Sequence, residues 1–130
     1  MILQNKIEII FLLMVLFQLK HFLADFPLQG EYMLKKTLSG WGFVAPLSLH
    51  SGIHAILTLG IVAFFAPQLY WLAIFDFVIH FLMDRIKSGE RYLGRFNDKS
   101  KSMYWNIFGL DQMVHHLTHI FIVYKIVESL

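Results

Sequence analysis

Histidine and aspartate side chains recur along this chain at a spacing of four residues, and that spacing is typical of a metal-binding face on a helix. All seven histidines and four of the five aspartates fall within, or at the edge of, long apolar runs. The groups with this spacing are His21/Asp25, His50/His54, Asp76/His80/Asp84 and Asp111/His115/His119. Because a step of four residues places side chains on one helical face, one turn apart, each group can direct its ligands toward a common ion.

The depth of these residues in the predicted helices also matches. Depth is counted inward from the loop ends at about 1.5 Å per residue. Four of the predicted ligands then share one depth, three lie about one turn deeper, and the remaining two, Asp25 and Asp84, lie nearer the loops. The predicted metal ligands are His21, Asp25, His50, His54, Asp76, His80, Asp84, Asp111 and His115. Imidazole and carboxylate ligands favour a divalent metal, zinc first, with manganese, iron, cobalt or nickel as alternatives. Nine ligands exceed the needs of one ion, so we expect either two ions or one ion with many outer partners.

Histidines and aspartates in membrane helices can also serve roles other than metal binding. A single histidine in a membrane helix usually makes only an interhelical hydrogen bond. Paired histidines and aspartates also form proton relays, whereas haem would not need the interspersed aspartates. His116 points about 100° away from His115, and His119 is the deepest of the set, so a structural or outer-partner role explains either as well as ligation does. Repetition of the pattern in four segments makes metal binding the favoured interpretation.

The elements that must position these residues are four apolar segments. The chain is 57% apolar and 15% charged, with a mean hydropathy of +0.58, which is far from the composition of a soluble domain. The segments cover about residues 7–27, 44–66, 69–86 and 103–127, each near the roughly 20 residues that cross a bilayer. The sequence therefore predicts an all-α, single-domain membrane protein, a bundle of four transmembrane helices over residues 1–130. Since it has no cysteine, any metal must be held by nitrogen and oxygen.

The distribution of basic residues predicts the orientation in the membrane. Four spans put both termini on one face and the two longer loops on the other, and the loops carry eight basic residues against Lys6 and Lys125 on the terminal face. The loops should therefore be cytoplasmic and both termini non-cytoplasmic. Lys20, inside the first segment, is expected to extend its side chain toward the loop interface. The segment 28–42 is expected to cover the site from the loop side.

Several of these motifs resemble a known family. The stretch from His21 to Gln29 (HFLADFPLQ), the segment LHSGIH ending at His54, HFLMDRIK from His80 and DQMVH from Asp111 are similar to an uncharacterised family of small bacterial and phage membrane proteins, a domain of unknown function. The resemblance implies a bacterial inner-membrane location, and it implies no established activity. A looser similarity, to predicted membrane-bound metal-dependent hydrolases, is an analogy only.

The function expected from these observations is metal-dependent hydrolysis. A bound ion would activate water and polarise a phosphoryl or acyl group, with Asp25 or Asp84 as general base. Arg85 or Lys87 would hold an anionic group of a lipid-like or phosphorylated substrate that arrives from the cytoplasmic leaflet. The alternatives are a metal-ion or proton-coupled transporter, and a metal-stapled bundle that binds another membrane protein. We expect membrane lipids as partners and no nucleic acid, and the sequence is compatible with a homo-oligomer.

Overall fold

Four long α-helices occupy the four apolar segments. The computed structural model describes residues 2–130 and places α1 at Ile2–Asp25, α2 at Val44–Phe65, α3 at Trp71–Ser88 and α4 at Ser102–Ser129. The short 3-10 helices η1 (Glu31–Thr37), η2 (Pro67–Leu69) and η3 (Leu93–Arg95) lie in the connections, and residues 2–130 contain no strand. The prediction of an all-helical protein is therefore confirmed. The 18 residues of α3 span about 27 Å and the 28 residues of α4 about 42 Å.

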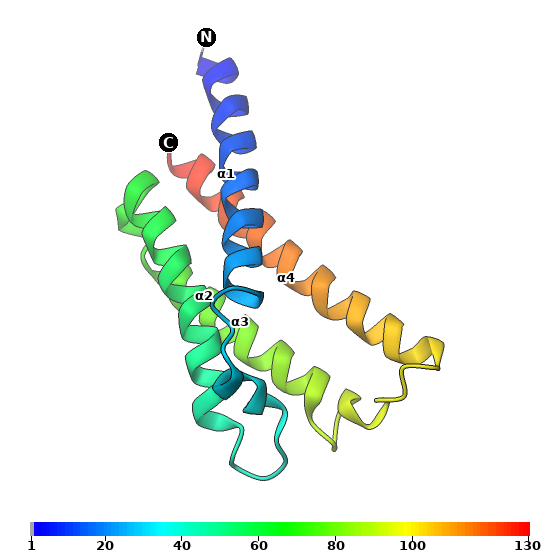
Figure 1. The fold of residues 1–130 in the computed structure, drawn as a ribbon. Coiled ribbons are helices and arrows are strands. Elements are labelled where there is room, and N and C mark those ends of the chain that lie inside the picture. Colours follow the sequence, from blue (N-terminus) through cyan, green and yellow to red (C-terminus); the bar gives the residue numbers. More distant parts are fainter. Residues whose placement is uncertain (1) are drawn as a thin grey trace.

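The helices run alternately up and down. Both termini and the turn at η2 lie at one end of the bundle, and the connections 26–43 and 89–101 lie at the other (Figure 1). We call these the terminal end and the loop end. Helices α1 and α3 each pack mainly against α2 and α4, so α1 and α3 are diagonal neighbours across the bundle. All four helices therefore have one face toward a common interior.

Local sequence explains where the helices end. Pro67 has no backbone N–H and cannot continue α2, so the helix closes with the Ala66 N–H donating to the Val62 carbonyl at 2.7 Å. The chain then reverses within η2, which makes α2 and α3 antiparallel neighbours as the sequence predicts. At the other end of α3, a Cβ atom on Gly94 would lie 2.3 Å from the Ser88 carbonyl oxygen. Only glycine allows the 89–101 connection to fold back so closely onto α3.

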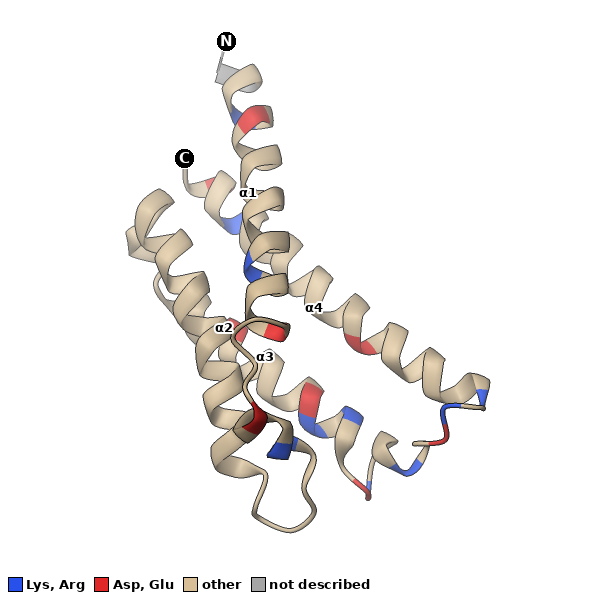
Figure 2. Cartoon of the chain, viewed as in Figure 1, with Lys and Arg blue, Asp and Glu red and all other residues tan. Residues whose placement is uncertain are grey.

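The interior of the bundle has two layers of different polarity. Toward the terminal end it is apolar and almost fully enclosed, with Leu13, Phe17, Val62, Leu72 and Ile122 each at 0% exposure. Toward the loop end the buried side chains include histidines, aspartates, threonines, Ser51 and one lysine. The outer surface carries many large apolar side chains (Figure 2 shows how few charges the helices carry). Burial is thus inverted relative to a soluble protein, in which ionised side chains are rarely enclosed and large apolar patches are rarely exposed.

Two of the helices are long and apolar enough to cross a membrane by length and composition. They are α1, over Gln4–Asp25, and α2, over Val44–Phe65. Only 28% and 33% of their apolar windows are buried in the protein, so neither resembles the core helix of a soluble domain. The sequence led us to expect four such helices. Composition alone supports two, because α3 and α4 also carry the aspartates and histidines of the interior.

Candidate metal centre

All four helices contribute side chains to one polar cluster in the loop half of the bundle. The last turn of α1 supplies His21 and Asp25, the first half of α2 supplies two histidines, and the middles of α3 and α4 supply the remainder. Of the nine predicted ligands, eight are buried and Asp25 is partly exposed. All of them except Asp76, joined by His119, form three groups of potential ligands, and within each group the ligand atoms lie within 4.8 Å of one another.

The first group joins α1 to α2 through the Asp25 carboxylate. Asp25 Oδ1 lies 2.9 Å from His54 Nε2 and 3.4 Å from His50 Nε2, and Asp25 Oδ2 lies 3.0 Å from His21 Nε2. The ring nitrogens of three histidines therefore converge on one carboxylate. We call Asp25, His50 and His54 the α1/α2 group.

The second group joins α3 to α4. His115 Nε2 lies 3.0 Å from Asp111 Oδ1 and 3.4 Å from Asp84 Oδ1, and we call these three residues the α3/α4 group. The other oxygen of Asp84 lies 3.5 Å from His50 Nε2 in the first group. Asp84 thus stands between the two groups, with one carboxylate oxygen toward each.

His80 lies at the centre of the cluster. Its ring stacks between those of His54 and His115, at centroid distances of 3.9 and 4.0 Å. Its Nε2 atom is buried without a hydrogen-bond partner in the described chain, and it forms a third group of potential ligands with His21 and His119. The sequence leaves the role of His119 open. In the structure this side chain is 1% exposed and belongs to the third group, so His119 is a potential ligand.

Lys20 corrects a sequence-based prediction. Its side chain does not extend to the interface; it is 3% exposed, and its Nζ atom lies 2.7 Å from Asp76 Oδ2. Thr58 donates to the same oxygen at 2.5 Å, and His80 Nδ1 lies 2.9 Å from Asp76 Oδ1. A buried carboxylate attracts a lysine more strongly than a distant interface does, because both charges then avoid isolation in a low-dielectric interior. Asp76, predicted as a ligand, has Oδ2 bonded to Lys20 and Thr58 and belongs to none of the three groups.

Two more lysines approach the cluster from the loop end. Lys36 of η1 places Nζ 2.9 Å from Asp84 Oδ2, and Lys87 places Nζ 2.9 Å from Asp111 Oδ2. Lys87 lies just beyond the predicted third span. Burial acts to lower its pKa, but the carboxylates of Asp84 and Asp111 outweigh burial and raise the pKa above its usual value. The segment expected to cover the site therefore does reach it, through Lys36, which sequence reasoning did not single out.

Arg85 points away from the cluster, and His116 lies at its edge. The Arg85 guanidinium lies 3.6 Å from the centre of the Phe43 ring and donates to the Leu38 carbonyl at 3.2 Å. His116 Nδ1 lies 3.4 Å from Gln18 Nε2, and its partly buried ring lies 5.4 Å from the ring of His21. Arg85, predicted to hold substrate, thus binds the 38–43 connection instead of facing the ligands. Consecutive residues on a helix point about 100° apart, so Arg85 faces a different side of α3 from Asp84, which faces the cluster.

The donor set of the cluster could hold a divalent ion. His80, which forms a group of potential ligands with His21 and His119, keeps its Nε2 atom buried without a hydrogen-bond partner in the described chain. Unsatisfied buried polar atoms are costly, so a network built only for stability would pair them. Imidazole nitrogens and carboxylate oxygens are also the ligands that zinc, manganese and iron use when no thiolate is present.

A family model described as "Protein of unknown function (DUF3307)" matches residues 12–130. The chain belongs to the DUF3307 family. The matched range contains every side chain of the cluster, together with Lys20, Lys36 and Lys87. No curated protein and no solved structure matches the chain. For this DUF3307 protein, any activity must therefore be argued from the geometry of the cluster.

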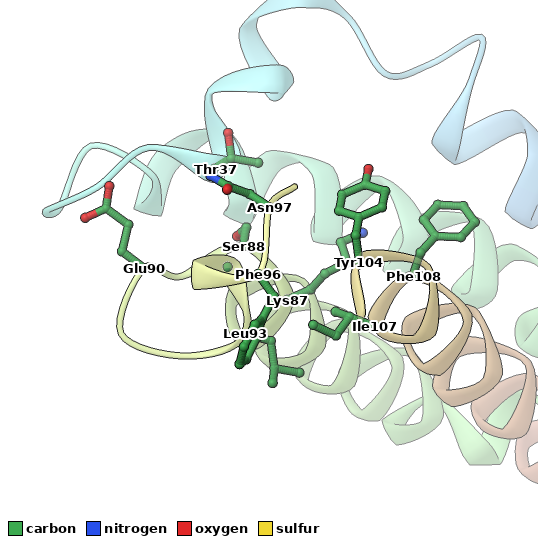
Figure 3. Close-up of a pocket in the computed structure, with 11 residues that line it drawn as sticks. Thr37, Lys87, Ser88, Glu90, Leu93, Phe96, Asn97, Tyr104, Ile107 and Phe108 are labelled. Carbon is green, nitrogen blue, oxygen red and sulfur yellow. The ribbon is translucent and has the colours of Figure 1, made fainter. Parts of the chain in front are cut away.

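A cavity of about 450 Å³ lies beside the α3/α4 group at the loop end of this DUF3307 protein (Figure 3). It is lined by the end of α3, the start of α4, Thr37 and the 89–101 connection. Lys87 belongs to its lining and also contacts Asp111. The cavity thus adjoins the cluster on the side at which the loops are expected to face the cytoplasm.

Proposed function

We propose that this protein is a membrane-embedded, metal-dependent hydrolase that acts on a lipid-like or membrane-associated substrate from the cytoplasmic leaflet. The observation that carries the proposal is the position of Asp84 between His50 and His115, at 3.5 and 3.4 Å. A carboxylate with one oxygen toward each of two histidine-containing groups suits a centre of two ions, or one ion with an adjacent general base. Zinc is our first choice of metal, and manganese or iron would suit the same ligands.

The proposal includes four membrane spans, although composition supports two. The polar side chains that lower the apolar character of α3 and α4 point inward, whereas their outward residues, such as Ile74, Leu82, Met113 and Leu117, are 50–61% exposed and apolar. A hydropathy average cannot distinguish inward from outward residues. Trp105 and Trp41 are exposed at the loop end, and Trp71 is exposed at the terminal end, as expected for interfacial aromatic residues.

The chemistry divides between the ion and the carboxylates. A divalent ion would lower the pKa of a bound water and polarise a phosphoryl or acyl group. Of the two proposed general bases, the Asp25 side chain is 23% exposed and that of Asp84 is 4% exposed. Asp25 is therefore the base that a substrate reaches first, while the enclosed Asp84 is better placed to hold the ion and fix the histidines.

Transport across the membrane is a weaker alternative. An ion pathway needs polar groups on both sides of the bundle, yet the terminal half of the interior consists of Leu13, Phe17, Val62, Leu72 and Ile122, all at 0% exposure. Such packing favours a site open to one side. A metal that only staples the bundle is the other alternative, and the following experiment separates it from catalysis.

The experiment replaces each proposed base by its isosteric amide. Asp25→Asn and Asp84→Asn are expected to lower the hydrolysis of bis(p-nitrophenyl) phosphate or a p-nitrophenyl acyl ester in mixed micelles by about 100-fold or more. An amide at position 25 cannot accept the proton, and an amide at position 84 holds the ion and the histidines less well. The folded bundle and part of the bound metal should survive. Asp98→Asn is the matched control, since Asp98 lies in the exposed 89–101 connection and accepts only from Ser100.

Three results would count against the proposal. Unchanged rates in both variants would remove these carboxylates from catalysis. Loss of metal, fold and activity together in both variants would favour a structural staple. Failure of the wild-type protein to hydrolyse either ester class with its metal bound would contradict the hydrolase.

A further inference from the structure

The cavity at the loop end is lined by one cation, one anion and several apolar side chains. Lys87 is the one cation among the described residues that line it, and Leu93, Phe96, Ile107 and Phe108 supply apolar surface. Figure 3 shows Glu90 on the opposite side of the cavity from Tyr104 and Phe108. Glu90 is exposed, whereas Ile107 is 7% exposed. The polarity therefore changes from one part of the cavity to another, as it does along an amphiphile.

Lys87 keeps hydrogen-bonding capacity for a ligand. An ammonium group has three N–H donors. One is directed to Asp111 Oδ2 at 2.9 Å, and Asp84 Oδ1 lies at 4.0 Å, at the limit of an ion pair. The side chain of Lys87 is 29% exposed, so a donor is available to an anionic group in the cavity.

The wall of the cavity is preformed. The Gly94 N–H donates to the Gly89 carbonyl at 3.0 Å, and the Tyr92 N–H donates to the same carbonyl at 2.9 Å. These bonds hold the connection against the end of α3, where Gly94 leaves no room for a side chain. Since the wall need not be ordered on binding, a ligand would lose less affinity to loop entropy.

The four proposed membrane spans would place the cavity at the level of lipid head groups. Trp105 and Phe108, on the first turns of α4, are 56% and 45% exposed. Exposed aromatic residues at a helix end are typical of the membrane interface. An acyl or isoprenoid chain could therefore lie against the α4 side of the cavity while its head group reaches Lys87.

We propose that this cavity binds an amphiphile with an anionic head group, with the head group on Lys87 and the chain against Ile107 and Phe108. The proposal rests on the proposed function, because it names the substrate class for that centre. Lys87 connects the two sites, since it contacts Asp111 of the α3/α4 group and also lines the cavity. An anionic group held there would lie beside the proposed metal ligands.

The test uses a phosphatidic acid with a photoactivatable acyl chain, incorporated into nanodiscs of neutral phosphatidylcholine with the whole chain. Mass spectrometry should map the label to residues 93–108. Lys87→Met should lower labelling about ten-fold, the effect of losing one charge-assisted hydrogen bond, and Lys87→Arg should retain most of it. The matched control is Lys101→Met, because Lys101 is exposed on the same connection and does not line the cavity.

Several outcomes would overturn the proposal. These are equal labelling by a photoactivatable phosphatidylcholine, full labelling of a Lys87→Met protein with unchanged thermal unfolding, or label that maps elsewhere. Displacement of the label by excess inorganic phosphate would contradict a lipid source in favour of a soluble phosphate. Metal content of the same samples keeps the two proposals separate. Normal metal without labelling rejects the cavity alone, and labelling without metal rejects the metal centre alone.

Discussion

At the scale of single residues, contacts within a helix follow from spacing, and contacts between helices do not. His21 with Asp25, Asp76 with His80 and Asp111 with His115 lie 2.9–3.0 Å apart, as their four-residue spacing predicts. The pairing of Asp25 with His54, and of Lys20 with Asp76, depends on the rotation of each helix about its axis. A sequence pattern fixes which face is polar but leaves that rotation open, so the lysine was assigned to the wrong environment.

The Lys20–Asp76 pair gives a prediction about stability. Lys20→Met should lower the free energy of unfolding by about 3–5 kcal/mol, because Asp76 is then left as an unpaired buried charge. The double variant Lys20→Met/Asp76→Asn should recover much of that loss, since the amide that replaces the carboxylate carries no charge and can still accept from Thr58. Denaturant or thermal unfolding in a neutral detergent measures both.

The matched control for this pair lies on the surface. Lys125→Met breaks an exposed contact with Glu128 and should change the unfolding temperature little. If the double variant loses as much stability as the sum of Lys20→Met and Asp76→Asn, the two charges are not coupled and the pairing is wrong.

At the scale of elements, the helices could be predicted and the cover over the site could not. Apolar runs bounded by Pro67 and by glycine-containing polar stretches mark α2 and α3 to within two or three residues. The segment 28–42 offered only its position as evidence of a cover. Its contact depends on η1 and on the choice of Lys36 over the neighbouring Lys35 to reach Asp84, a choice decided by the turn geometry of one short helix.

Lys36 therefore predicts how firmly this cover is held. In Lys36→Met, amide hydrogen exchange in residues 31–37 should quicken about ten-fold, because the charge-assisted bond to Asp84 no longer opposes local opening. Lys35→Met is the control, since Lys35 is exposed and has no contact with the cluster. Equal exchange in the two variants would show that Lys36 does not hold the segment on the site.

At the scale of the whole molecule, the up-and-down arrangement of the four helices agrees with the sequence analysis. The number of spans differs, because the arrangement suggests four and composition supports two. Buried His80, Asp84, Asp111 and His115 make α3 and α4 too polar for a test of average hydropathy. The same residues led us to predict the cluster. The histidines and aspartates that indicate the site in the sequence therefore also lower the mean hydropathy of α3 and α4 below the threshold for a membrane span.

The orientation of the bundle is testable without a purified protein. Both termini should lie outside the cytoplasm, because the two loops carry eight basic residues and the terminal face carries Lys6 and Lys125. A reporter active only in the cytoplasm should be silent at either terminus and active within the 89–101 connection. Full activity at both termini would reverse the orientation, and activity at one terminus alone would require an odd number of spans.

The metal content of the purified protein tests the central claim most directly. Elemental analysis of protein prepared without a polyhistidine tag should find about one to two divalent ions per chain, given the ligand groups on α1/α2 and α3/α4. His54→Ala and His80→Ala should lose most of that metal, because His54 belongs to the first group and His80 stacks at the centre. His116→Ala should keep most of it, since His116 belongs to none of the three groups of potential ligands. Wild-type protein that binds no stoichiometric metal when divalent ions are supplied, or metal content equal in His54→Ala and wild type, would contradict this account.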